Sequence, residues 1–171
     1  MTVLTDFLAG AGTDATGRRI AEIRVQPPQW LEMRHDFIQW LFPLPEPSGA
    51  NLMAPLLGRG EAATIAADAG LRAALLANLD AMMRLYGIER DGADFRRGAA
   101  FPGPYRDWLG PIDHNHLRFT RMLRCLSLCG LRAEAEGLRH LLFDIAAQEA
   151  AGAWTSCLRY WRDAGLPPAG W

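Results

Sequence analysis

Two short stretches of the chain carry the polar side chains best suited to bind or transform a ligand. In the first, MRHDFIQWLFPLPEPSGAN (33–51), His35 and Gln39 interrupt an otherwise apolar run. Their spacing of four places both on one face of a helix. Burying such groups costs free energy unless each finds a hydrogen-bond partner. Two interpretations are therefore open: paired core side chains, which is the commoner case, or the polar floor of a ligand pocket.

The second stretch, HNHLRFTR (114–121), follows Asp113, which is suited to cap a helix. The free N–H groups and partial positive charge at a helix N-terminus favour an anion. The candidate binding residues here are His114, Asn115, Arg118 and Arg121. Together they could hold a carboxylate or a phosphate, since the two arginines lie one helical turn apart. The alternative is a capping motif beside a solvated row of arginines, and we favour this alternative for Arg124.

Trp108 precedes this stretch in a segment rich in Gly and Pro, where it could cover a pocket or anchor the loop. A metal site is not expected, because His114 and His116 do not share a helix face and no zinc-type spacing occurs. The three cysteines, Cys125, Cys129 and Cys157, are expected to be small buried core residues. Enzyme motifs such as GxSxG and HExxH are missing, so the sequence predicts neither a metal nor a cofactor.

The elements that position these residues are expected to be helices, because strand-like alternation is nearly absent and 3.6-residue periodicity recurs. We predict a single all-α domain over residues 1–171, with six or seven helices. The first expected helix starts after Asp14, as its N-cap, and covers Ile20 and Ile23. The others cover 28–41, 61–67, 69–86, 114–130, 138–145 and 154–161. Residues 89–112 are expected to form a long loop rich in Gly and Pro.

The composition narrows the class of protein. Half of the 171 residues are apolar, the net charge is −1, and all 18 basic residues are arginine. Without a basic field, nucleic-acid binding is not expected. The absence of lysine, together with heavy use of Ala and Gly, points to GC-rich coding and a bacterial source. We see no signal peptide and no run of the ~20 apolar residues that a membrane span needs, so we expect a cytoplasmic location.

The stretch HDFIQWLFPLPEPSGAN (35–51) resembles the conserved region of the opioid growth factor receptor family, whose hallmark is IQWLFPL. The similarity continues through MMRLYGI (82–88) and HNHLRFTRMLRCLSLCGL (114–131), with His116 where the family pattern leads us to expect Asn. It covers roughly residues 30–145. The resemblance implies a receptor for a short opioid peptide and an association with nuclear membranes. We expect neither property here, because the sequence contains no opioid-site signature and no membrane segment.

Three functions are compatible with these patterns. The first is a helical module that binds a short peptide or a small anion through the residues above, with Trp108 as a lid. The second is an interaction scaffold without a pocket, for which Trp154, Trp161 or Trp171 would form an exposed patch. The third and least favoured is an enzyme that uses His35 or His114 as a general acid or base. In the first case, the helix carrying His35 and Gln39 should pack against the turn carrying His114 and Asn115.

Overall fold

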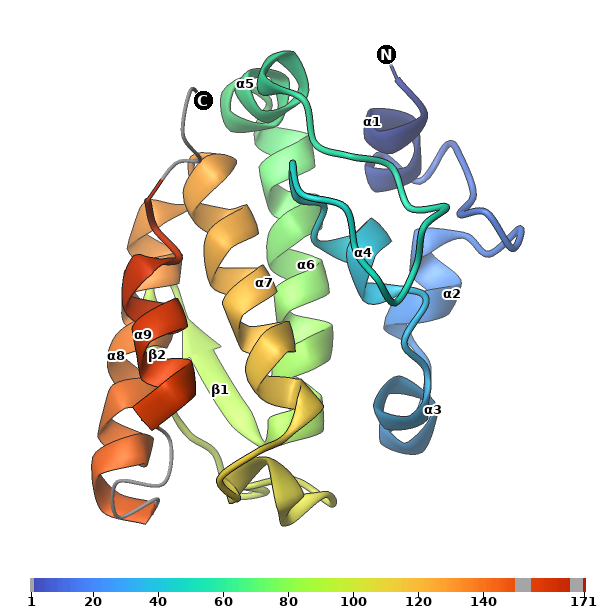
Figure 1. Ribbon diagram of the computed structural model, residues 1–171. Coiled ribbons are helices and arrows are strands. Elements are labelled where there is room, and N and C mark those ends of the chain that lie inside the picture. The colour runs from blue at the N-terminus through green and yellow to red at the C-terminus, as the bar shows by residue number, and fades with distance from the viewer. Residues whose placement is uncertain (1, 150–154, 167–170) are drawn as a thin grey trace.

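A computed structural model describes residues 2–149, 155–166 and 171. Within these residues the chain forms nine α-helices, one short 3-10 helix and a two-stranded antiparallel hairpin (Figure 1). The elements, in chain order, are α1 (Val3–Leu8), α2 (Ile20–Arg24), α3 (Pro28–Met33), α4 (Ile38–Leu41), α5 (Arg59–Ala67), α6 (Ala69–Tyr86), β1 (Ile88–Asp91), β2 (Asp94–Arg97), η1 (Arg106–Leu109), α7 (His114–Leu128), α8 (Arg132–Glu149) and α9 (Thr155–Asp163).

The long helix α6 runs through the middle of the molecule, with α1–α4 on one side and α7–α9 on the other (Figure 1). The Asp68 side chain caps its first turn by accepting a hydrogen bond from Leu71 N at 3.0 Å, and Gly87 ends it. Its buried face is apolar at helical spacing and comprises Leu71, Leu75, Leu79, Met82 and Tyr86. The sequence predicted this helix with nearly its observed bounds because cap, periodicity and glycine stop agree.

The helix expected over residues 28–41 is two helices, α3 and α4. The backbone is extended at Arg34, where ψ is 141°, and α4 begins only at Ile38. The break leaves the carbonyl groups at the end of α3 without partners in the helix. Arg118 supplies those partners from α7: its Nη2 donates to Glu32 O at 3.1 Å and to Arg34 O at 2.7 Å.

The expectation of a purely α-helical chain with a long loop at residues 89–112 is wrong in part. Strands β1 and β2 pair with Asp91 opposite Asp94, and Gly92, at φ +59°, allows the tight turn between them. The hairpin packs against α8 at Gly137, where an added Cβ would overlap the carbonyl group of Ala93. The missed signal is the Asp-Gly pair at residues 91–92, a common hairpin turn.

Trp108, in η1, is a core residue and not a lid. It is only 1% exposed, and its Nε1 donates to Pro102 O at 2.9 Å. Its ring contacts those of Tyr86, Phe119 and Phe101 at centroid distances of 5.4, 5.4 and 5.8 Å. The indole therefore anchors the segment after the hairpin to α6 and α7.

The cysteines, and the tryptophans considered for an exposed patch, lie in the core or against it where the structure describes them. Cys125, Cys129 and Cys157 are buried core residues, as predicted. Of the tryptophans considered for an exposed patch, Trp161 is fully buried, Trp171 is partly buried against the core, and Trp154 lies outside the described residues. Over the part of the chain that the structure describes, none of the helices combines the length and apolar character needed to cross a membrane.

We predict that Trp108→Ala lowers the free energy of unfolding by about 3–5 kcal/mol, because it removes a fully packed indole and leaves a cavity. Urea denaturation followed by circular dichroism measures this change. The matched control is Ile112→Ala, since Ile112 is 90% exposed and its truncation should change stability by less than about 0.5 kcal/mol. Equal effects of the two substitutions would contradict the core placement of Trp108.

Candidate functional site

Arg118 joins the two stretches singled out in the sequence. It extends from the second turn of α7 and is only 4% exposed. Besides the α3 carbonyl groups, its Nη1 donates to Asn115 Oδ1 at 3.1 Å and lies 3.5 Å from Glu32 Oε2. A buried guanidinium needs both hydrogen bonds and a counter-charge, and here it has both. Its charge is therefore already compensated within the fold.

Asn115 joins Arg118, Glu32 and Tyr86 in one buried hydrogen-bonded group, which we call the polar centre. Its backbone N–H donates to the Asp113 carboxylate at 2.7 Å, which confirms Asp113 as the helix cap. Its side-chain Nδ2 lies 3.2 Å from each Glu32 carboxylate oxygen, and its Oδ1 accepts a hydrogen bond from the Tyr86 hydroxyl at 2.7 Å. Complete burial raises the pKa of Tyr86, so its hydroxyl remains a donor. Asn115 thus serves the core and does not line a cavity.

His35 and His114 are neighbours at the surface of this centre. Their rings meet edge to face with centroids 5.0 Å apart, and His114 Nε2 lies 3.2 Å from Glu32 Oε1. Partial burial lowers the pKa of His35, and the charges of Arg118 and His114 lower it further, while Glu32 and Asp36 oppose the effect. His35 is therefore a neutral imidazole near pH 7. This contact confirms that the two stretches lie together, but the prediction of one helix carrying both His35 and Gln39 is wrong, because His35 lies in the break between α3 and α4.

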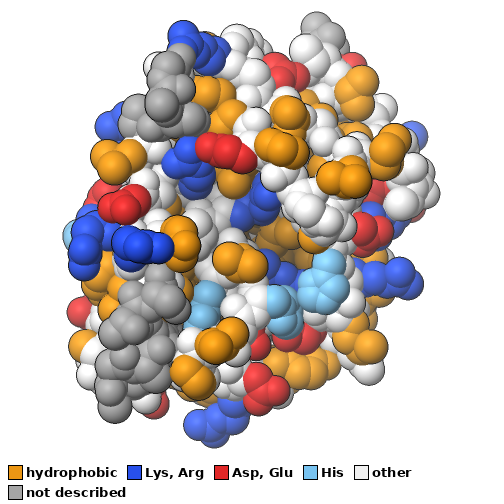
Figure 2. Space-filling view, viewed as in Figure 1, with side chains coloured by type: hydrophobic (Ala, Val, Ile, Leu, Met, Phe, Trp, Pro, Cys, Tyr) orange, Lys and Arg blue, Asp and Glu red, His pale blue; other side chains and the backbone are white. Residues whose placement is uncertain are grey.

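A cavity of about 330 Å³ opens beside the two histidines, between α4, the following loop and α7. Figure 2 shows a hollow on this face, with histidine side chains at its edge and arginine inside it. The lining residues are His35, Ile38, Gln39, Leu44, Ser48, Ala50, His114, Leu117, Arg118, Thr120 and Arg121. The volume falls at the small end of the range usual for ligand sites.

Arg121 is the cation in this cavity that forms no ion pair with a described residue, although the charge of Glu46 acts on it at longer range. Its Nη1 donates to Phe42 O at 3.1 Å, but none of the described carboxylates lies within ion-pair distance of it. By contrast, Arg118 pairs with Glu32, and Arg124 Nη2 lies 2.5 Å from Glu46 Oε1. Burial lowers the pKa of Arg121, which reflects the cost of keeping this charge in a poorly hydrated position.

Gln39 contributes a second unsatisfied group. It is 4% exposed, and its Nε2 donates to His35 O at 3.0 Å and to Ser48 Oγ at 3.2 Å. Its buried Oε1 accepts no hydrogen bond from any residue that the structure describes. Because buried amide oxygens are nearly always paired in native proteins, this oxygen is suited to a donor that a ligand would bring.

The structure thus separates the predicted site residues into two groups. His35, Gln39, His114, Arg118 and Arg121 line one cavity, whereas Asn115 lies beneath it and Trp108 lies in the core. The sequence analysis did not identify Glu32 and Tyr86, which contact Asn115 in the polar centre. Glu32 stands three residues before His35, a helical spacing that could have flagged it, but the chain is not helical throughout that interval. Among residues 2–149, 155–166 and 171, no cluster of three His, Cys, Asp or Glu side chains is arranged to hold a metal ion.

Residues 21–164 match the sequence profile described as the opioid growth factor receptor (OGFr) conserved region. The chain belongs to this family. The OGFr region therefore includes the whole polar centre, from α3 to α7. His116, where the family pattern leads us to expect Asn, has its Nε2 2.8 Å from Trp108 O and is buried away from the Arg121 side chain's cavity.

Curated OGFr relatives are similar over the same region. The human opioid growth factor receptor is 32% identical over 138 residues, which is 76% of this chain and 20% of the human protein. The mouse protein is 36% identical over 104 residues, or 59% of this chain and 16% of that protein. The chain thus spans a fifth or less of the length of these receptors. No solved structure gives a significant match.

We predict that Glu32 and Asn115 are energetically coupled, because they share hydrogen bonds with each other and with Arg118. A double-mutant cycle on Glu32→Ala and Asn115→Ala, measured by urea unfolding, should give an interaction energy of about 0.5–3 kcal/mol. The control cycle combines Glu32→Ala with Glu136→Ala, whose side chains share no partner, and it should be additive. Additivity in both cycles would mean that the polar centre is not one network.

Proposed function

We propose that the cavity between α4 and α7 binds a short peptide or a small anionic molecule through a carboxylate or phosphate group. The observation that carries the proposal is Arg121, a largely desolvated cation without an ion-pair partner among the described residues. An anion that pairs with it would recover the Coulomb energy and hydrogen bonds that the fold does not provide.

The remaining lining residues support a ligand that also carries a hydrogen-bond donor. Gln39 Oε1 is an unused acceptor, and the His35 imidazole offers either a donor or an acceptor nitrogen. A peptide terminus has both a carboxylate and amide N–H groups, so it fits this combination. The name of the relatives, opioid growth factor receptor, states a receptor role for those proteins, and a peptide ligand for this chain is consistent with it.

An interaction scaffold is the second candidate. Ile112, Leu117 and Tyr160 are 90%, 70% and 50% exposed, and they line an adjoining hollow of about 360 Å³ that shares His114 and Leu117 with the first cavity. Exposed apolar clusters of this kind mark protein contacts. A His-dependent enzyme ranks third: the contact between His114 and Glu32 could orient a general base, but the site contains no activated nucleophile.

We propose a cytoplasmic location and a bacterial source for the chain. The location is supported by the burial of all three cysteines among apolar side chains, which suits a reducing compartment. The source is supported by the exclusive use of arginine among the 18 basic residues. Expression of a fluorescently tagged chain in a bacterial host, followed by fractionation, tests the location.

Arg121→Gln should weaken anion binding about tenfold or more, because it removes the unpaired charge while keeping a polar side chain. Isothermal titration with tetra-alanine as the free acid, with its C-terminal amide and with inorganic phosphate measures this effect. We expect the acid to bind more tightly than the amide, and Arg121→Lys to retain part of the difference. Arg139→Gln removes an arginine far along the chain, on α8, and should change nothing. Equal affinity for acid and amide would refute the proposal.

Anion binding should strengthen as the pH falls toward the lowered pKa of His35. Partial burial, and then the charges of Arg118 and His114, hold the pKa of unliganded His35 below its usual 6.5, and a bound anion offsets the repulsion and raises it. Binding therefore takes up protons in the window between the two pKa values, so affinity rises as the pH falls through it. Titrations in two buffers of different ionisation enthalpy report the uptake directly. In His35→Gln the uptake should be smaller, and an identical pH profile would exclude His35 from the site.

A further inference from the structure

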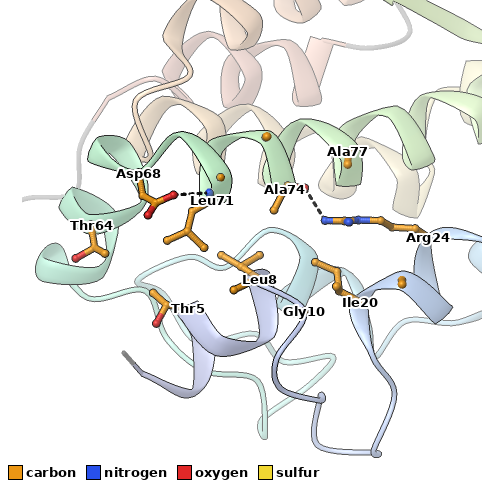
Figure 3. Close-up of a pocket in the computed structure, with 14 residues that line it drawn as sticks. Thr5, Leu8, Gly10, Ile20, Arg24, Thr64, Asp68, Leu71, Ala74 and Ala77 are labelled. Atoms are coloured by element: carbon orange, nitrogen blue, oxygen red, sulfur yellow. Dashed lines mark hydrogen bonds between the residues drawn. The ribbon is translucent and has the colours of Figure 1, made fainter.

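A second and larger cavity lies on the other side of α6, between that helix and α1, α2 and α5. Its volume is about 620 Å³, and it shares no lining residue with the cavity beside His35. Figure 3 shows its walls: Leu8 and Ile20 face Leu71 and Ala74 across the gap. With the exception of a few polar groups at its ends, the surface is aliphatic.

The cavity exists because α6 presents small residues on this face. Gly70, Ala73, Ala74 and Ala77 recur at helical spacing and none of them reaches across to α1 and α2. Gly70 and Ala73 are exposed at its rim, so the cavity is a groove open to solvent with an aliphatic floor. The volume lies well within the range of sites for small molecules.

Arg24 places a positive charge at one end of this apolar space. Its Nε donates to Asn78 Oδ1 at 2.7 Å and its Nη2 donates to Ala74 O at 2.8 Å, so the guanidinium is held in a fixed position (Figure 3). None of the described carboxylates forms an ion pair with it, and its Nη1 donates to no described residue. Burial lowers the pKa of Arg24, as expected for a charge that has lost water without gaining a counter-ion.

The other charged lining residue is Asp68, at the opposite end of the cavity from Arg24 (Figure 3). Its carboxylate caps α6 through Leu71 N. The charge pattern along the cavity is therefore a cation at one end, an aliphatic middle and a carboxylate at the other end. An anionic head group is attracted to the Arg24 end and repelled from the Asp68 end.

We propose that this cavity binds a linear amphiphile with a carboxylate head, such as a medium-chain fatty acid. The carboxylate pairs with the Arg24 guanidinium, whose position is already fixed by Asn78 and the Ala74 carbonyl group. The hydrocarbon chain lies over Ile20, Leu8 and Leu71. This site is independent of the anion-binding cavity beside His35.

The test is calorimetric titration of the full chain with hexanoate, octanoate and decanoate below their micellar concentrations. At the saturable site in this cavity we expect a gain of about threefold to fourfold in affinity for each added methylene, the gradient of hydrocarbon burial. Decanol, which lacks the charge, should bind about tenfold more weakly than decanoate. Absence of saturable binding, or equal affinity for decanoate and decanol, would overturn the proposal.

Two variants distinguish the contact of the carboxylate head with Arg24 from the contact of the hydrocarbon tail with the cavity walls. Arg24→Gln should abolish the preference for decanoate over decanol. Ala73→Leu keeps every Arg24 contact but fills the cavity, and it should weaken both ligands by at least about tenfold. Arg139→Gln, on α8, removes an arginine that lines neither cavity and should leave decanoate binding unchanged. Wild-type affinity in Ala73→Leu would show that the fatty acid binds elsewhere and would refute the assignment.

Discussion

The arrangement of α3, α4 and α7 depends on the hydrogen bonds and the ion pair of the buried Arg118 guanidinium. The chain stops being helical after Met33 and resumes at Ile38, so the end of α3 presents carbonyl groups to the interior. Arg118 binds two of them and, through Glu32 and Asn115, links α3 to α6 and α7. Since removing one partner of a buried charged network leaves the others unpaired, the break in the helix and the arginine must be retained together. The direction of α4, and with it the position of Gln39, follows from this arrangement.

The same arrangement divides three arginines of one helix into different roles. Arg118 and Arg124 each pair with a glutamate, whereas Arg121 donates only to a backbone carbonyl. Spacing along α7 could not distinguish them, because their roles are decided by residues far away in the chain, Glu32 and Glu46. The sequence does reveal that polar groups at residues 35–39 and 114–115 need partners. It therefore predicted their proximity, while the assignment of each charge required the tertiary structure.

The fold was predictable where local signals agree and not where tertiary contacts override them. The α6 helix combines a cap, an apolar stripe and a terminal glycine, and its bounds were predicted closely. The 28–41 segment has uninterrupted helical character in sequence, yet it breaks because Arg118 stabilises the free carbonyl groups. The sequence left Trp108 as either a pocket cover or a loop anchor, because it lies in a segment rich in Gly and Pro; the hairpin before it returns the chain to the core, where Trp108 is buried as an anchor. A loop composition says little about burial once a neighbouring strand pair fixes its path.

The contact between the β1–β2 turn and α8 ties the length of the turn to the size of the residue at position 137. Because Gly137 admits the backbone of Ala93 so closely, any larger residue there would displace the hairpin, and any longer turn would collide with the helix. A related protein with a longer β1–β2 turn must therefore also differ in the surface of α8 around residue 137. Correlated changes at residues 93 and 137 in related sequences would therefore reflect this contact.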